Sequence, residues 1–141
     1  MAIVDASVYV AILNINEVRH QASVDWLHQA RQSEEQILAP NILLAEVGAA
    51  ISRGTGNTQL AQNVLQHLKT STLIELRSIT DILATRAAEI AINYHIRGCD
   101  AVYIALAEQT NQALVTLDQQ QLKRGAAIIT TISPVSYTHL R

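Results

Sequence analysis

Four acidic side chains stand where a folded chain could use them for chemistry. Asp5 follows the apolar run AIV and Asp118 follows ALVTL, so each is expected at the end of a strand. Glu46 lies in NILLAEVGAAIS among apolar residues at helical spacing, and Asp100 opens the helical segment CDAVYIALAEQ. Oxygen ligands of this kind suit Mg²⁺ or Mn²⁺. The four residues therefore predict a metal-dependent catalytic site.

Each of these acids also has a purely structural interpretation. Asp5 and Asp118 could simply cap the helices that follow them, and Asp100 could interact favourably with a helix dipole. Glu46 could form a salt bridge with an arginine, although a carboxylate on an apolar helix face is costly without such a partner. Taken together, the four acids indicate one shared pocket, because ligands of parallel sheets bind outside the carboxyl ends of the strands.

Two kinds of apolar segment alternate along the chain and predict the elements that position these acids. Short aliphatic runs predict five buried strands, at residues 2–5, 36–39, 73–76, 113–117 and 126–130. Longer segments with helical spacing predict helices at 7–14, 18–33, 41–53, 57–70, 80–95 and 99–110. Strands that alternate with helices imply crossover connections and a parallel sheet covered on both faces. The predicted fold class is α/β.

The composition of the chain favours one compact domain. Of its 141 residues, 49% are hydrophobic and 16% are charged, which suits a single core. We expect this domain to span residues 1–135, because the final SYTHLR, residues 136–141, abandons the apolar pattern and predicts a frayed or non-native tail. The net charge of −2 means that any contact with nucleic acid must come from local cations.

The N-terminal segment and the cysteine content indicate a cytoplasmic protein. Asp5 interrupts the first apolar stretch, and no basic region precedes it, which argues against a secretory signal. A single cysteine, Cys99, cannot form an internal disulfide and fits a reducing compartment. No window of about twenty residues is apolar enough to span a membrane.

Four segments in order resemble the motifs of the PIN-domain family, and in particular its VapC-type toxins of toxin–antitoxin pairs. They are IVDASVYVAIL with Asp5, LLAEVGAAI with Glu46, GCDAVYIALAEQ with Asp100 and LVTLDQQQL with Asp118. The resemblance implies a three-layer sandwich around a parallel sheet of about five strands. It also implies an endoribonuclease that cleaves RNA with Mg²⁺ or Mn²⁺ held by these four acids. Ser7 stands where the family often places a hydroxyl that supports the acidic site, and a helix cap is an equally good interpretation.

The same resemblance implies partners. It suggests a homodimer and a small antitoxin protein that covers the active site, and the apolar helices at 7–14 and 57–70 are candidates for either surface. Four cations near the acids are candidate contacts for RNA phosphates, although each could serve solubility alone: Arg53, Arg97, Lys123 and Arg124.

Two other functions compete with a nuclease. A catalytically silent PIN-like module would bind RNA or regulate without cleaving, and it would be expected to lack one or more of the four acids, all of which are present. A phospho-accepting receiver domain also uses strand-end aspartates with Mg²⁺, but it requires one after the third strand. The segment LIELRSIT has no aspartate there. The sequence therefore favours the ribonuclease.

Overall fold

A parallel sheet forms the centre of the molecule. The computed structural model describes residues 1–135, in which five strands are ordered β3-β2-β1-β4-β5, and every neighbouring pair is parallel. The strands are β1 (Ala2–Val4), β2 (Ile37–Pro40), β3 (Ile74–Arg77), β4 (Ala113–Val115) and β5 (Thr131–Ile132). This sheet confirms the predicted α/β class.

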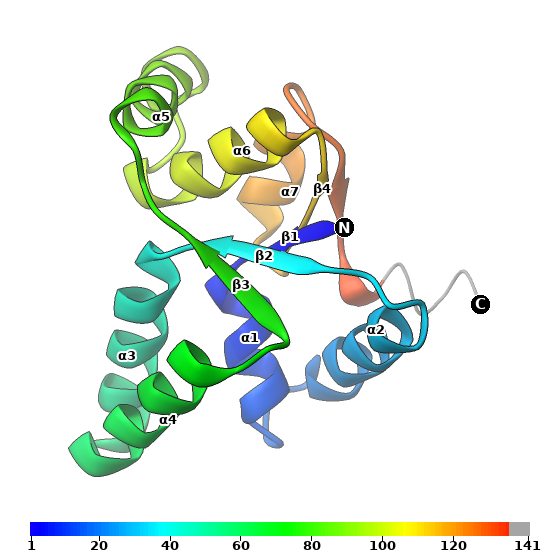
Figure 1. Cartoon of the computed structure of the whole chain (residues 1–141), viewed down its shortest axis with the longest axis vertical. Helices are drawn as coiled ribbons and strands as arrows, with labels where there is room; N and C mark the ends of the chain where they lie inside the picture. Colours follow the sequence, from blue (N-terminus) through cyan, green and yellow to red (C-terminus); the bar gives the residue numbers. More distant parts are fainter. Residues whose placement is uncertain (136–141) are drawn as a thin grey trace.

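Helices cover both faces of the sheet and give three layers (Figure 1). One side carries α1 (Ala6–Leu13), α2 (His20–Gln32), α3 (Ile42–Thr55) and α4 (Thr58–Thr70), and the other carries α5 (Asp81–Tyr94), α6 (Gly98–Thr110) and α7 (Gln119–Gly125). Six of these helices lie within about two residues of their predicted bounds. The helix α7 was not predicted, because its sequence QQQLKRG is polar and short.

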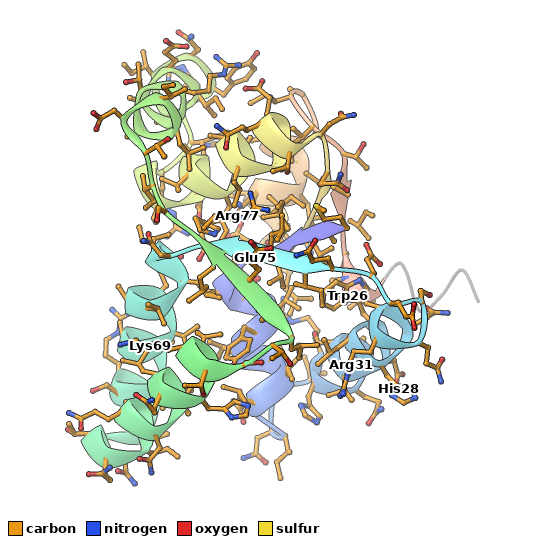
Figure 2. The ribbon with its side chains drawn as sticks, viewed as in Figure 1. Trp26, His28, Arg31, Lys69, Glu75 and Arg77 are labelled. Atoms are coloured by element: carbon orange, nitrogen blue, oxygen red, sulfur yellow. The ribbon has the colours of Figure 1, made fainter. Side chains whose placement is uncertain are left out.

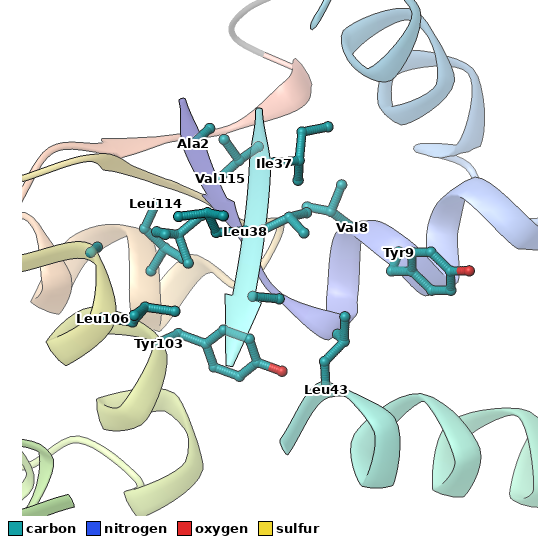
Figure 3. Close-up of a cluster of buried hydrophobic side chains, with 14 of the residues drawn as sticks. Ala2, Val8, Tyr9, Ile37, Leu38, Leu43, Tyr103, Leu106, Leu114 and Val115 are labelled. Atoms are coloured by element: carbon teal, nitrogen blue, oxygen red, sulfur yellow. The ribbon is translucent and has the colours of Figure 1, made fainter. Parts of the chain in front are cut away.

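Strand and helix side chains interlock across the layers to form the core. Ile3, Leu38 and Leu114 of the three central strands are fully buried. Helix α6 packs on β1, β2 and β4 and contributes the buried Tyr103 and Leu106 to this cluster (Figure 3). Because α6 is buried along much of its length, packing in the core fixes the position of this helix.

The fifth strand was predicted at the wrong residues. The apolar run 126–130 forms a turn after α7, in which the amides of Ile128 and Ile129 donate to the carbonyl of Gly125 at 2.9 and 3.0 Å. The strand that pairs with β4 is instead Thr131–Ile132. Ile128 and Ile129 still pack against the core, so their apolar character reflects burial and not strand pairing.

Charged side chains mark the outer strand β3. Glu75 and Arg77 (Figure 2) form an ion pair of 3.0 Å. Gln36 donates to Glu75 at 2.5 Å. Charges on an edge strand discourage pairing with another chain.

The predicted tail at 136–141 lies outside the described residues. Across residues 1–135, no helix combines the length and hydropathy that crossing a membrane would require.

Candidate active site

The strand order brings the carboxyl ends of β1 and β4 together. From β1 the chain continues to β2 on one side, whereas β4 lies on the other side, so the direction of winding reverses between β1 and β4. Such a reversal leaves a crevice at the carboxyl ends of the strands. Asp5 directly follows β1, and Asp118 lies three residues beyond β4. These two acids, 113 positions apart in sequence, therefore flank the same crevice.

Asp5 is buried, with 4% of its surface exposed, and is held by several donors. Ser7 Oγ donates to Asp5 Oδ1 at 2.5 Å, and Thr116 Oγ1 donates to Asp5 Oδ2. The backbone amide of Val8 donates to Asp5 Oδ1 at 3.3 Å, so Asp5 also caps α1. Asp5 therefore caps α1, as the structural interpretation predicts, and the same side chain lies in the crevice.

The hydroxyls around Asp5 tie β1 to the loop after β4. Ser7 Oγ accepts from the amide of Leu117 at 3.0 Å, and Thr116 Oγ1 accepts from the amide of Asp118 at 3.1 Å. Ser7 lies inside α1, whose cap is Asp5, and so it supports the acidic cluster and does not cap the helix. Burial raises the pKa of Asp5 from its usual 3.8 to about 6, against the opposing effect of these hydrogen bonds.

Glu46 reaches the crevice from α3 and meets a neutral partner. The hydroxyl of Tyr103 on α6 donates to Glu46 Oε1 at 2.6 Å. Among the ion pairs of residues 1–135, none involves Glu46, so the predicted alternative of an arginine partner is not observed. Burial, followed by the adjacent carboxylate, raises the pKa of Tyr103 well above its usual range, and the hydroxyl therefore remains a proton donor.

A single arginine bridges the other two acids. Arg97 Nε donates to Asp100 Oδ2 at 3.0 Å, and its Nη2 lies 3.5 Å from Asp118 Oδ2. Burial raises the pKa of Asp100 above its usual value, and Arg97 partly offsets that effect. Asp118 also caps α7, because its Oδ1 accepts from the amides of Gln120 and Gln121 at 2.9 and 3.0 Å.

These side chains line one acidic pocket of about 90 Å³. Its lining comprises Asp5, Ala6, Ser7, Glu46, Arg97, Asp100, Tyr103 and Asp118. All four acids predicted from the sequence therefore lie in a common pocket, on side chains from separate elements.

The donor set of the acidic pocket fits a hard divalent cation. The pocket offers four carboxylates, and its lining includes no imidazole or thiol. As these side chains stand, no three His, Cys, Asp or Glu residues within 1–135 are close enough together to hold an ion jointly. Mg²⁺, however, retains several waters and is commonly bound through only one or two carboxylates, so a closer cage is not required.

The four candidate cations differ in their relation to the pocket. Arg97 lies in its lining, and Arg124 adjoins it, since Arg124 shares a smaller neighbouring pocket with Arg97 and Asp100. Arg124 also donates to the carbonyl of His95 at 2.5 Å. Arg53 and Lys123 are exposed in the last turns of α3 and α7, outside the lining of either pocket.

Two hydrogen-bond partners of the pocket acids were missed by reasoning from sequence. Thr116 is a hydroxyl residue inside the apolar run ALVTL, and that polar interruption before Asp118 was a usable signal. Tyr103 follows Asp100 by one helical turn, so its place on the same face was visible, but nothing in the sequence indicated that it meets Glu46, which is 57 positions away.

Comparisons with known proteins agree with this architecture. Residues 2–127 match the PIN domain family. Ribonuclease VapC3 of Pyrobaculum aerophilum is 28% identical over 129 residues, which cover 91% of this chain and 97% of that protein.

Solved structures of similar fold come from several bacteria. VapC20 of Mycobacterium tuberculosis, a Sarcin-Ricin loop cleaving toxin, superposes with a TM-score of 0.74 at 19% identity, covering 89% of this chain and 95% of that one. A FitAcB structure from Neisseria gonorrhoeae also gives 0.74 at 18% identity, with coverage of 96% and 99%. VapBC2 of Rickettsia felis, bound to a promoter DNA fragment, gives 0.72 at 16% identity, with coverage of 94% and 97%.

The fold and the acidic pocket thus define a three-layer α/β protein with its site at the carboxyl edge of a parallel sheet. Since the family match spans most of the chain, this protein belongs to the PIN-domain family. Within that family it is similar to VapC-type proteins.

Proposed function

We propose that this protein is a divalent-metal-dependent endoribonuclease and the toxin of a toxin–antitoxin pair. The observation that carries the proposal is the convergence of Asp5, Glu46, Asp100 and Asp118 on one pocket beside an exposed arginine. Like charges gathered in this way are unfavourable unless a cation compensates them, so a structural role explains them poorly. The relative named Ribonuclease VapC3 supports the same activity.

The catalytic chemistry follows from the residues of the pocket. When bound, Mg²⁺ or Mn²⁺ would supply a water of lowered pKa and neutralise charge that develops on the phosphodiester. Asp5, Glu46, Asp100 and Asp118 would hold that ion, directly or through its waters, and Arg97 in the same lining would contact the scissile phosphate. Ser7 and Thr116 keep Asp5 in place through the hydrogen bonds described above. This division of roles requires no side chain to form a covalent intermediate with RNA.

Cations around the pocket would guide the RNA backbone. Arg97 and Arg124 are the better placed, because both lie beside Asp100 in one small pocket. Arg53 and Lys123 would contact phosphates further along the strand. Contacts of this kind position a nucleic acid without reading its sequence.

We further propose that this protein binds an antitoxin protein and forms a homodimer. We also propose that it acts in the cytoplasm and that residues 1–135 form one domain. A groove of about 470 Å³ between α1, α3 and α4 supports the partner. Its lining includes Leu13, Ile51, Leu60 and Val64, and Leu13 and Leu60 are exposed large hydrophobic residues. The helices predicted at 7–14 and 57–70 contribute to this groove. Solved relatives include a toxin–antitoxin complex from Klebsiella pneumoniae.

Cleavage of defined RNAs tests the proposed activity. The purified parent should cut RNA when Mg²⁺ or Mn²⁺ is present and stop when EDTA is added, and Asp100→Asn should abolish cleavage. Asp25→Asn, which makes the same change on α2 away from the acidic pocket, should cleave like the parent. Undiminished cleavage in EDTA by a preparation free of contaminating nuclease would refute the metal dependence. RNA binding without cleavage by the parent would favour a silent binding module.

Thermal melts separate a metal ligand from a structural acid. In metal-free buffer, Asp100→Asn should be as stable as the parent or more stable, because burial penalises the charged form of Asp100. Mn²⁺ should raise the melting temperature of the parent, because it binds only the folded state, and should raise that of Asp100→Asn much less. A destabilised variant that keeps the full Mn²⁺ shift would remove Asp100 from the proposed metal site.

A further inference from the structure

Glu46 is held in the acidic pocket differently from the other three acids. Asp5 accepts from two hydroxyls and one backbone amide, and Asp100 and Asp118 share Arg97. Glu46 has the longest side chain of the four and lies half-buried on α3, so it has the most rotamer freedom to lose. The side-chain hydrogen bond that Glu46 makes within residues 1–135 comes from a neutral donor, the hydroxyl of Tyr103.

Tyr103 is well suited to fix the direction of that carboxylate. Only 1% of its surface is exposed, and its ring extends from α6 into the core (Figure 3). From there it extends past the end of β2, with the hydroxyl pointing toward the start of α3. Packing around this buried ring restricts where its hydroxyl can lie, and the 2.6 Å hydrogen bond ties Glu46 Oε1 to that position.

A neutral donor has an advantage over a cationic one here. A lysine or arginine on Glu46 would also orient its carboxylate, but it would compete with a divalent ion for the same negative charge. The tyrosine hydroxyl donates one hydrogen bond and leaves the second oxygen and the full charge available. Groups behind a metal ligand commonly act in this way, by fixing its orientation.

We infer that Tyr103 is a positioning residue of the proposed nuclease, and that its hydroxyl holds Glu46 in the orientation needed for metal binding and cleavage. The inference rests on the proposed function for the cleavage step. Its effect on metal binding is separate and needs no RNA. Tyr103→Phe removes only the hydroxyl and keeps the buried ring. Tyr9→Phe is the matched control, because Tyr9 is also a buried tyrosine but does not line the acidic pocket.

The first test compares cleavage kinetics at saturating Mn²⁺. Tyr103→Phe should lower kcat roughly 10- to 100-fold, the usual effect of removing a partner behind a ligand. The KM for RNA should stay within about 2-fold of the parent, because the phosphate contacts are untouched. Tyr9→Phe should match the parent in both. A kcat for Tyr103→Phe within about 2-fold of an active parent would overturn the positioning role.

The second test is a double-mutant cycle on Mn²⁺ affinity, measured by electron paramagnetic resonance of the free ion. Tyr103→Phe and Glu46→Ala should each weaken binding, and the double variant should bind no more weakly than Glu46→Ala alone. Independent, additive losses would overturn the inference. If the parent does not cleave RNA, the proposed function fails, while this cycle still decides whether Tyr103 acts through Glu46.

A third measurement covers the case in which Tyr103→Phe does not fold. The chain is prepared with 3-fluorotyrosine at every tyrosine, and the Tyr103 resonance is assigned by elimination with Phe at the other positions. Glu46→Gln should shift the ¹⁹F resonance of Tyr103 and leave that of Tyr9 unchanged. An unmoved Tyr103 resonance would overturn the contact and the inference with it.

Discussion

The acids of the pocket have neighbours of three kinds, and each kind has a different consequence. Hydroxyls and an amide surround Asp5, a phenol contacts Glu46, and a guanidinium joins Asp100 to Asp118. The hydroxyls and the phenol orient a carboxylate without cancelling its charge. The guanidinium supplies a charge that can be displaced by a metal ion.

Removing the charge of Asp5 should change how stability depends on pH. Burial raises the pKa of Asp5 from 3.8 to about 6 in the folded protein. Protonated Asp5 therefore contributes its full stabilisation below about pH 3.8, and this contribution is lost as the pH rises through about 6. A difference of this size corresponds to roughly 3 kcal/mol. Part of this change occurs below pH 4, so in EDTA the stability of Asp5→Asn relative to the parent should rise by ~2 kcal/mol between about pH 4 and about pH 7.

Urea denaturation at several pH values measures this effect. Hydrogen bonds that Asn cannot replace would lower the stability of Asp5→Asn by an amount that does not depend on pH, so the slope of the difference isolates the charge. Asp25→Asn on α2 is the control, because it measures how the loss of one surface carboxylate changes the free energy of unfolding. A difference between Asp5→Asn and the parent that stays constant with pH would contradict a buried, charged Asp5.

Replacing Arg97 should tighten metal binding while weakening RNA binding. The side chain of Arg97 is 74% exposed, so its ion pairs with Asp100 and Asp118 are weak, at most about 1 kcal/mol. A cation must displace it from both carboxylates, and Arg97→Gln should therefore bind Mn²⁺ up to about 5-fold more tightly. Loss of a phosphate contact should raise the Kd for RNA at low salt.

Arg53→Gln provides the control for that measurement. It removes the same charge from an exposed position outside the acidic pocket, so it should leave Mn²⁺ affinity almost unchanged. Isothermal titration of Mn²⁺ into the parent and both variants distinguishes local competition from a general change in net charge. Equal effects of Arg97→Gln and Arg53→Gln on Mn²⁺ affinity would contradict competition between Arg97 and the ion for the carboxylates.

Among the elements, α6 carries two residues of the acidic pocket. It is joined to α5 by an ion-pair cluster centred on Arg86, which we call the clamp. Arg86 Nε and Nη2 donate to the two carboxylate oxygens of Glu108 at 2.7 and 2.9 Å, and Nη1 donates to Glu89 at 3.2 Å. Arg86 thereby lowers the pKa of Glu108 below its usual value. A bidentate pair is stronger than an ordinary surface ion pair.

Breaking this clamp should loosen α6 against α5. Arg86→Gln should lower the free energy of unfolding by about 1 kcal/mol at low salt, and by less at high salt, since the pair is partly exposed. Arg77→Gln is a suitable control, because Arg77 pairs once, with Glu75 on the same strand. Urea denaturation at two salt concentrations checks both. A loss for Arg86→Gln that does not exceed that of Arg77→Gln would show that the clamp adds no stability.

In the whole molecule, the order of the strands creates the site. Placing β4 beside β1 brings Thr116 to Asp5 across 111 positions of sequence, and α6 then lays Tyr103 over the same edge. The helical layers contribute Glu46 from one side of the sheet and Asp100 from the other (Figure 1). Neither layer alone contains the complete set of carboxylates.

The sequence by itself determined the class of fold and the four acids. The positions of Asp5 and Asp118 after apolar runs are local features, as is the apolar helical face around Glu46, and alternating strands and helices leave few arrangements besides a parallel sheet. That the four acids share a pocket at the strand ends could therefore be predicted before any long-range contact was known.

Only the tertiary structure decided the partners of those acids and the register of the last strand. The run 126–130 (AAIIT) is apolar except for Thr130, and burial in a turn produces the same pattern as burial in a strand. The hydrogen bonds of Thr116 and Tyr103, and the bridge from Arg97 to Asp118, join residues 21 to 111 positions apart. Such pairs depend on how helices and strands pack, and local periodicity carries no information about which distant side chain lies opposite.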